Sequence, residues 1–352
     1  MIDVYANGKK FSGWLSARLG FSLDHIAATF SLSLAPFGDL GGLGIFPGDS
    51  CEVFCDGERV IDGFVDRLSS SFGTGLHTVE VSGSERTSDI ADCSLVVPHE
   101  WTDRDAGEIV SDVCRAFGLY FSNPLGVDSG KRFSKFSAEP GGRALDVISK
   151  ICRERGILVR SDGLGRVSFF RPELARRGDS LRQGENLLSA RAEYSLVDRF
   201  SEYTVLGTGN PRKKVSGKAS DAEVLRPRRL VIVDTNATEK DKVEARAEFE
   251  KNSRMAKSSK VEATVSGWMS GSGIWKPGVV CSVLAPALGI PCEDFLVNSV
   301  NLSWSPSEGE TASLSLVPPG AYAPQPERSK KKKGKSPGKP DPWDSIRKTV
   351  RG

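Results

Sequence analysis

The sequence predicts an α+β protein that is mainly β, with two related β-barrel domains and a helix–strand region between them. Two observations lead to this prediction. Apolar residues alternate with a period of two near both ends of the folded part of the chain, which is typical of strands with one buried face. Between these regions the apolar period lengthens to that of an amphipathic helix. A chain of 352 residues is long enough for about two to four domains.

The first β-barrel domain is expected in residues 1–85. Its strands are expected in four alternating segments, residues 26–36, 51–57, 59–72 and 77–83. Turn residues separate the segments: a GDLGGLG stretch, then Asp56-Gly57, then the Gly-Thr-Gly of residues 73–75. Several short strands at this spacing favour a small barrel or sandwich.

The middle region, residues 86–182, contains one helix–strand unit twice. Helices are expected at residues 105–117 and 144–155. Gly118 and Gly156 follow them at the position where a helix ends in a left-handed residue, and a short strand comes next. Thr102, three residues before Asp105, suits a capping box at the first helix.

A cysteine followed by an arginine occurs at the same place in both units. Sliding one unit by 38 residues superimposes Cys114 on Cys152 and Arg115 on Arg153. A neighbouring cation can activate a thiol, but these cysteines lie at or beside the apolar stripe of their helices, where free cysteine behaves as a small hydrophobe. Arginine in a last helical turn is favoured by the helix dipole. The pattern therefore favours core cysteines over reactive thiols.

A second repeat relates the two ends of the folded part. PGDSCEVF of residues 47–54 resembles PGVVCSVL of residues 277–284, and DGFVDRLSSSF of residues 62–72 resembles DFLVNSVNLSW of residues 294–304. An alternating strand follows each set. A second β-barrel domain is therefore expected in residues 183–322, with further strands near 187–196, 200–207 and 228–234. A helical insertion near 238–256 is expected to interrupt it, opened by a capping box from Thr238 to Asp241.

The net charge of +3 hides a difference between the body and the end of the chain. Residues 328–352 contain ten Lys/Arg and two Asp/Glu, which leaves the remaining body with 38 basic and 43 acidic residues. The body is therefore mildly acidic, which argues against a folded surface that binds nucleic acid. Residues 323–352 are expected to be a flexible basic tail.

The tail holds the candidate docking residues for a partner: Lys330, Lys331, Lys332, Lys333 and Trp343. Solubility or docking on an acidic partner surface is favoured for the lysines. Contact with nucleic acid or with an anionic membrane surface is the alternative.

No catalytic residue, cofactor or metal ligand is predicted. The histidines lack ligand-spaced partners, and Cys51 with Cys55 lacks the second pair that a zinc site needs. The glycine clusters lack a phosphate-loop pattern, and no GxSxG elbow occurs. Asp62, Asp66 and Asp294 recur at matched places of the two repeats, which favours turn or edge chemistry over a catalytic pair.

The remaining composition is that of a soluble globular protein. No stretch approaches eighteen consecutive apolar residues, so no membrane span is expected. The start lacks a signal-peptide pattern, and seven widely spread cysteines favour reduced thiols, so we expect synthesis and residence in a cytoplasm.

The chain resembles the baseplate hub proteins of Mu-like contractile-tailed phages over nearly all of residues 1–322. In the first half the resemblance is carried by Gly13-Trp14, PGDSCEVFCDGERVIDGFVD and HTVEVSGSERTSDIADCS. In the second half it is carried by RPRRLVIVD, RAEFEKNSRMAKS and VSGWMSGSGIWKPG. These are folding motifs and assign no active site.

The resemblance implies a structural protein of the virion tail baseplate, assembled in the host cytoplasm, and not an enzyme. Such hubs are homotrimers with two similar β-barrels per subunit, so that a threefold ring presents six barrels around a channel. The ring joins the sixfold tail tube to the threefold central spike. The implied partners are other copies of this chain, the spike protein, the tail tube or distal tail protein, and other baseplate proteins.

Two other functions stay open on the sequence alone. A cell-wall hydrolase acting during tail penetration would need a cleft with paired acids. A nucleic-acid or membrane-binding module would use Lys330–Lys333 of the tail.

Overall fold

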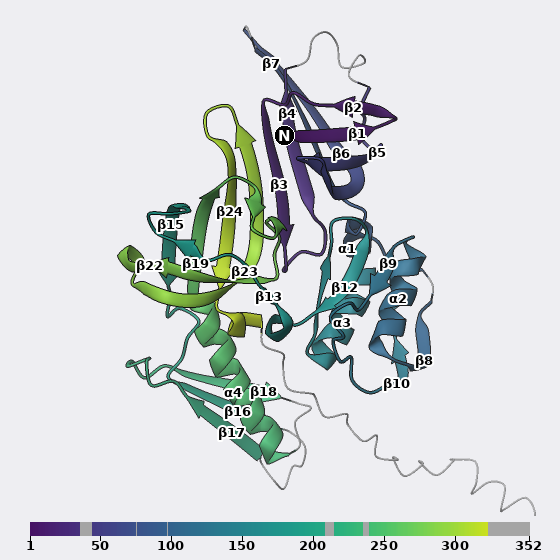
Figure 1. Cartoon of the computed structure of the whole chain (residues 1–352). Coiled ribbons are helices and arrows are strands. Elements are labelled where there is room, and N and C mark those ends of the chain that lie inside the picture. Colours follow the sequence, from purple (N-terminus) through teal and green to yellow (C-terminus); the bar gives the residue numbers. More distant parts are fainter. Residues whose placement is uncertain (36–43, 75, 97, 208–214, 235–238, 323–352) are drawn as a thin grey trace, which may run out of the picture.

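A computed structural model of the chain describes residues 1–35, 44–74, 76–96, 98–207, 215–234 and 239–322 (Figure 1). The candidate docking residues Lys330–Lys333 and Trp343 lie outside these residues, and so does Thr238. Within them the protein is mainly β, as the sequence predicts. None of the helices in the described ranges is both long and apolar enough to cross a bilayer.

The described residues of the N-terminal unit form strands and no helix. It comprises β1 (Ile2–Ala6), β2 (Lys9–Phe11), β3 (Ser16–Ser22), β4 (Thr29–Leu34), β5 (Ser50–Cys55), β6 (Glu58–Gly73) and β7 (Leu76–Glu85). The expected Asp56-Gly57 turn joins β5 to β6, with φ values of 48° and 84° at its two residues. Positive φ at both positions gives the turn that suits a two-residue β-hairpin.

The C-terminal unit repeats this arrangement. It comprises β13 (Arg176–Arg177), β14 (Leu181–Arg182), β15 (Leu187–Tyr194), β19 (Ser259–Ser266), β20 (Met269–Ser270), β21 (Gly273–Ile274), β22 (Val279–Ala285), η3 (Pro286–Leu288), β23 (Ile290–Ser305), β24 (Gly309–Val317) and η4 (Pro319–Tyr322). Five strands of each unit lie in the same order, β3-β4-β7-β6-β5 in one and β15-β19-β24-β23-β22 in the other.

The strand register confirms that the two units are related. Cys51 lies opposite Gly63 on the neighbouring strand, and Cys281 lies opposite Phe295, as the sequence repeat requires. The register of β6 against β7 shifts between Val65 and Arg67, and that of β23 against β24 shifts between Val297 and Ser299. Each long strand therefore carries a bulge residue against its β7 or β24 neighbour, Asp66 or Asn298, at equivalent places.

The two closed barrels expected from the sequence are not formed by these pairings. β3 pairs with residues 299–304 of β23, so the described strands of both units form one 14-stranded sheet with the open path β15-β19-β24-β23-β3-β4-β7-β6-β5-β1-β2. The reason lies in the length of β23. Its first half pairs with β22, and its second half is left to accept the edge strand of the other unit.

One face of this sheet forms the main hydrophobic core. Ala17, Leu19 and Phe21 of β3 are buried, and so are the alternate residues of the neighbouring strands, such as Leu302 and Leu314. Because side chains alternate across a strand, every second residue points away from this core. The period-two pattern of the sequence therefore corresponds to a sheet that is apolar on one face.

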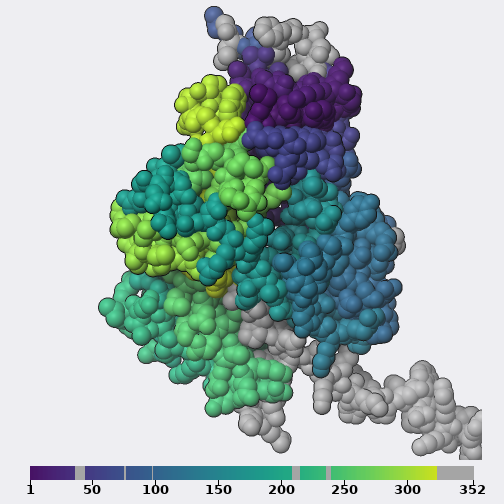
Figure 2. Space-filling model, viewed as in Figure 1, coloured from purple at the N-terminus to yellow at the C-terminus, as the bar shows by residue number. Residues whose placement is uncertain are grey.

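The middle region lies beside the N-terminal unit and has its own core (Figures 1 and 2). It comprises α1 (Ser88–Asp92), β8 (Glu100–Arg104), α2 (Ala106–Ala116), β9 (Tyr120–Ser122), β10 (Phe133–Ser137), α3 (Ala144–Arg155), β11 (Leu158–Ser161), β12 (Arg166–Phe170) and η2 (Pro172–Leu174). β9 and β11, the strands that follow α2 and α3, lie on either side of β12.

The ends of these helices agree with the sequence except at one start. Gly118 and Gly156 have φ values of 67° and 62°, which only glycine adopts without strain. The capping box of α2 is formed by Asp105 and Glu108, whose side chain and backbone groups bond reciprocally. The expected box from Thr102 to Asp105 is wrong because Thr102 belongs to β8.

The expected helical insertion is larger than one helix. α4 (Lys240–Lys257) covers a separate three-stranded sheet of β16 (Glu202–Gly207), β17 (Val215–Ser220) and β18 (Arg229–Asp234), with a small core of its own. The residue preceding α4, Glu239, makes no side-chain cap bond. This unit also contains a buried ion pair. Arg199 donates two hydrogen bonds, of 2.5 and 3.0 Å, to Asp221, which directly follows β17.

Asp221→Ala is expected to lower the free energy of unfolding by about 3 kcal/mol at neutral pH, because it leaves Arg199 buried with Glu223 as its remaining carboxylate. Hydrogen bonds from Arg199 hold the pKa of Asp221 below its ordinary value of 3.8. Its contribution is therefore present above that value and is lost as the pH falls through the lowered pKa. Urea denaturation of both proteins from pH 7 down to pH 3 measures the difference.

The matched control is Asp198→Ala, which removes an exposed carboxylate next to Arg199 in the chain. Equal effects of the two substitutions, or an Asp221→Ala difference that does not shrink in acid, would contradict the role of the buried pair.

Candidate functional site: the hydroxyl face of the sheet

The face of the sheet opposite the core is lined by small polar side chains over eight adjacent strands. We call it the hydroxyl face, because most of its residues are serine or threonine. It consists of Ser16, Arg18, Ser22, Thr29, Ser31, Ser33, Arg67, Ser69, Ser71, Glu80, Ser82, Ser84, Ser189, Arg191, Glu193, Lys260, Glu262, Thr264, Ser299, Asn301, Ser303, Thr311, Ser313 and Ser315.

Strand register places these residues side by side. Arg18 lies opposite Ser31 on β4 and opposite Ser303 on β23, so the face continues across the junction of the two units. In the C-terminal unit Glu262 lies opposite Arg191 and opposite Ser315. One polar surface therefore spans the strands from β15 to β6.

The hydroxyl groups bond mainly to one another and to the few charges. Thr311 and Ser303 share a hydrogen bond of 2.8 Å, and Ser31 donates to Glu80 at 2.6 Å. Lys260 donates to Glu262 at 2.9 Å, which holds the pKa of that carboxyl below its usual range. The charges of the face thus nearly balance, and its chemistry is that of a hydrated, weakly charged surface.

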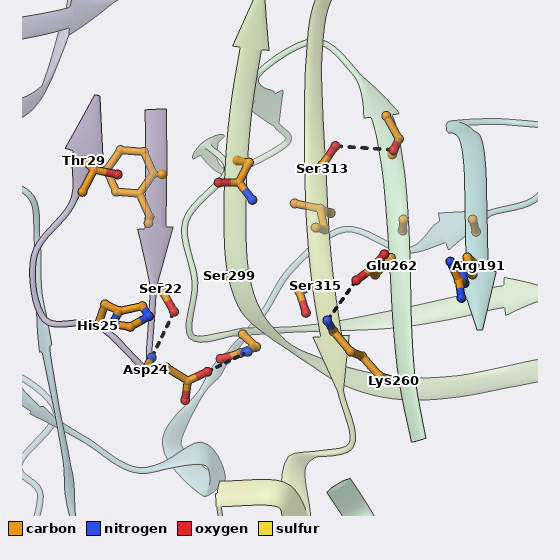
Figure 3. A pocket seen from close by; sticks show the side chains of 18 of the residues that line it. Ser22, Asp24, His25, Thr29, Arg191, Lys260, Glu262, Ser299, Ser313 and Ser315 are labelled. Atoms are coloured by element: carbon orange, nitrogen blue, oxygen red, sulfur yellow. Dashed lines mark hydrogen bonds and ion pairs between the residues drawn. The ribbon is translucent and has the colours of Figure 1, made fainter. Parts of the chain in front are cut away.

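Two shallow grooves run along this face. One of about 760 Å³ is lined by β3, β15, β19, β23 and β24, and Figure 3 shows its serines, Arg191, Lys260 and Glu262 projecting from neighbouring strands. The other, of about 990 Å³, crosses β3, β4 and the second half of β23. Gly20 lies in the floor of both; a Cβ there would approach Thr29 Oγ1 at 3.0 Å, so the strands pack closely at this point.

A polar cluster closes one end of the first groove. Asn298 donates to Asp24 at 3.1 Å, and the hydroxyl of Tyr322 contacts both side chains. Burial raises the pKa of Tyr322, and the hydrogen bond to Asp24 raises it further. The cluster ties a loop of the N-terminal unit to the bulge of β23 and to η4.

The carboxylates singled out by the repeat accept hydrogen bonds from nearby side chains, but they lie within the interior strands β6 and β23 and not in the turns or sheet edges that the sequence predicts. Asp62 accepts a hydrogen bond of 2.7 Å from Arg86, and Asp66 accepts one of 2.7 Å from Ser84. Asp294 accepts from Ser282 at 2.6 Å and from Arg177 at 2.8 Å, and these bonds lower its pKa. Within the described ranges, no group of three or more His, Cys, Asp or Glu is arranged to hold a metal ion.

One buried carboxylate was not singled out in the sequence. Glu85, at the end of β7, is fully buried, and burial raises its pKa. Its oxygens accept hydrogen bonds from the backbone of Ala28 and Gly165, both at 3.1 Å, and from the hydroxyl of Ser161. Donors from the middle region therefore hold Glu85 as a link between that region and the N-terminal unit.

Comparison with known proteins shows which family the chain belongs to. The baseplate hub protein gp44 of Escherichia phage Mu is 30% identical over 335 residues, which are 90% of this chain and 87% of that protein. The chain belongs to the family of Mu-like baseplate hub proteins. Family models match residues 1–85 as the N-terminal part of the Mu phage baseplate assembly protein GpP-like family, 87–171 as the second domain of the gp44-like baseplate hub and 238–325 as the fourth domain of GpP.

Solved structures of tail proteins share the fold of this hub protein. A 43 kDa tail protein of prophage MuSo2 from Shewanella oneidensis is 28% identical, with a TM-score of 0.82 over 92% of this chain and 99% of that one. A tail protein from Neisseria meningitidis MC58 has a TM-score of 0.76 at 17% identity, over 92% and 98% of the two chains. The hub proteins of this family are structural components of the tail.

The cysteines of the two helix–strand units are predicted to be unreactive in the folded protein. Cys114 and Cys152 are buried, and burial raises the pKa of each to about 12, so little thiolate exists near pH 8. Cys93 and Cys292 are exposed. Ellman's reagent at pH 8 should therefore label these two rapidly and the others only after unfolding.

Mass spectrometry identifies the labelled thiols, and a Cys93→Ser/Cys292→Ser variant provides the control, since its rapid phase should disappear. Rapid labelling of Cys114 or Cys152 in that variant would restore the reactive-thiol interpretation.

Proposed function

We propose that three copies of this chain form the hub ring of a contractile tail baseplate, which joins the sixfold tail tube to the threefold central spike. One observation carries the proposal: each chain holds the same five-strand unit twice, in the same order and with the bulge at the same place. Three such chains present six equivalent units, which resolves the mismatch between threefold and sixfold partners. The family membership supports the same role.

Within the ring, the hydroxyl face is the wall of the central channel. It is continuous over both units, and its nearly balanced charge lets a long charged polymer or a spike pass without strong attraction. Residues 1–85 and 183–322 supply two barrel-like wall segments, and residues 86–182 brace them on the outside or on the spike side. The mechanism is geometric and requires no bond to be broken.

The remaining parts of the proposal concern partners and location. The ring contacts the spike protein, the tail tube or distal tail protein and other baseplate proteins. It forms in the host cytoplasm and ends in the virion. The basic tail of residues 323–352, through Lys330–Lys333 and Trp343, docks on an acidic surface of one of these partners.

Light scattering after size exclusion tests the ring directly. A chain of 38.0 kDa should give a species near 114 kDa, three times its mass. A variant lacking residues 328–352 should keep this state, because the sheet and not the tail builds the wall. A chain that stays at 38.0 kDa at micromolar concentration, even with the spike protein added, would sink the proposal, and release of fragments from purified peptidoglycan would favour a hydrolase instead.

A further inference from the structure

A small cavity lies where three parts of the chain meet, beside the end of β3 and next to β12 (Figure 1). It has a volume of about 220 Å³, and we call it the junction cavity. The N-terminal unit contributes residues of the 21–28 segment and Glu85, the middle region contributes β9, β11 and β12, and the C-terminal unit contributes Lys276 and Pro277. Because this volume is below that of pockets for drug-sized ligands, the cavity suits a small ion or molecule.

Two hydroxyls and one guanidinium form a row on the wall that the middle region provides. Ser168 of β12 lies opposite Arg160 on β11 and opposite Ser122 on β9. Directly opposite residues of neighbouring strands point to the same face of a sheet, and all three of these residues line the cavity. The row therefore presents one cation and two hydroxyl donors to a molecule in the cavity.

The hydroxyl of Ser122 is the first observation that points to a ligand. Its Oγ is buried and has no hydrogen-bond partner in the part of the chain that the structure describes. Buried polar groups in native proteins are almost always hydrogen-bonded, because an unpaired one loses its bonds to water without replacement. An acceptor in the junction cavity would complete the hydrogen bonding of this serine.

The guanidinium of Arg160 is the second observation. It lies over the ring of Phe170, with Cζ 4.9 Å from the ring centre, and burial lowers its pKa. Among the described residues, Asp162 is the carboxylate whose charge acts on Arg160, but Asp162 forms its ion pair with Arg166, at 3.8 Å. The N–H groups of a guanidinium form a planar fork that binds oxyanions, and the ring contact restricts its movement.

The remaining charges at the cavity favour an anion over a cation. Lys276 Nζ lies 3.9 Å from Glu58, which is too far for a hydrogen bond. Asp162 accepts hydrogen bonds from the backbone of Leu164 at 2.8 Å and of Arg166 at 3.2 Å. Burial raises the pKa of Glu85, which favours its neutral form, and its oxygens accept the bonds described above. The titratable side chains that line the cavity are His25, Glu85, Arg160, Asp162, Arg166 and Lys276.

The carboxylates of the cavity thus use their oxygens within the chain, whereas Arg160 and Lys276 have donors left for a ligand. We propose that the junction cavity binds inorganic phosphate, with Arg160 and Lys276 supplying the charge and Ser122 and Ser168 donating hydrogen bonds. A tetrahedral oxyanion accepts hydrogen bonds in several directions at once, which suits donors that converge from three strands and from the opposite wall.

The bound ion holds the three parts of the chain together, because each part contributes residues to the site. Phe21 and Ser22, which lie at the end of β3, belong to both the cavity and the pairing with β23. Phosphate therefore reinforces the corner at which the two units join. The site uses no contact between subunits, so it does not depend on the proposed ring.

Thermal unfolding and calorimetry with inorganic phosphate test the site. Phosphate at low millimolar concentration should raise the melting temperature of the protein at constant ionic strength, because a ligand that binds only the folded state stabilises it. Isothermal titration calorimetry should give one phosphate bound per chain. Absence of binding in the calorimeter, or an equal rise in melting temperature with chloride, would overturn the proposal.

Two variants locate the site. Arg160→Gln and Ser122→Ala should each raise the dissociation constant for phosphate about tenfold or more, since each removes a hydrogen bond to a charged group. Ser122→Ala should do so without lowering the melting temperature in the absence of phosphate, because the hydroxyl that it removes has no partner among the described residues. Circular dichroism checks that both variants are folded.

Arg115→Gln is the matched control, because the side chain of Arg115 is 76% exposed on α2 and does not line the cavity. This variant should bind phosphate as the unchanged protein does. If Arg115→Gln weakens binding as much as Arg160→Gln, the effect comes from net charge and the site is wrong. Unchanged affinity in both Arg160→Gln and Ser122→Ala also overturns it.

Hydrogen exchange shows independently where phosphate binds. Phosphate should slow the exchange of backbone amides in residues 21–28 and 160–168, and this protection should be lost in Arg160→Gln. Protection confined to other segments would contradict the placement. Adenosine monophosphate carries the same phosphate on a larger body, so it should bind more weakly than inorganic phosphate, and tighter binding would overturn the assignment to the free ion.

Discussion

The pairing of β3 with the second half of β23 is the constraint on which the rest of the structure depends. It turns two repeated units into one sheet, and it makes their polar faces a single surface. The backbone of Leu23, just after β3, continues the contact by donating to Asn298 at 2.9 Å. The Asp24 and Tyr322 cluster then fixes the same corner with side chains.

The middle region braces this junction from both sides. On the N-terminal unit, Asp62 donates its backbone N–H to Gly163 at 2.8 Å, and a Cβ at Gly163 would approach the Val60 carbonyl at 2.1 Å. Only glycine fits so close an approach. On the C-terminal unit, Phe170 of β12 is buried in one cluster with Leu296 of β23. One region therefore contacts both wall segments, which resists their rotation about the single strand pair.

The features predicted correctly depend on residues close together in the chain. The features not predicted depend on the pairing of strands that are far apart in the chain. The alternating strands, the Asp56-Gly57 turn, the glycine helix ends and the buried cysteines follow from periods and backbone preferences of a few residues. The repeat and the resemblance to the Mu-like family are also visible in the sequence. The choice of β3 as the neighbour of β23 was not, because an edge strand carries the same alternation whether it closes a barrel or extends a sheet.

The features missed at the candidate site have the same origin. The serines of the hydroxyl face are visible as the polar half of the alternation in ATFSLSL and NSVNLSWS. These serines form one face across eight strands only because of how the strands pair in register, and the sequence does not predict that register. Glu85 reads as an ordinary strand residue until Ser161 and Gly165 come to lie against it. The sequence predicts the three strands under α4 as part of the second barrel because they alternate in the same way.

The bulges at Asp66 and Asn298 have a consequence for shape. An extra residue in one strand bends it and increases its local twist. Because both long strands carry this residue at the same place, the sheet is bent twice, at corresponding points of its two repeats. Bends at equivalent points of the two repeats curve the sheet in the same way in both units.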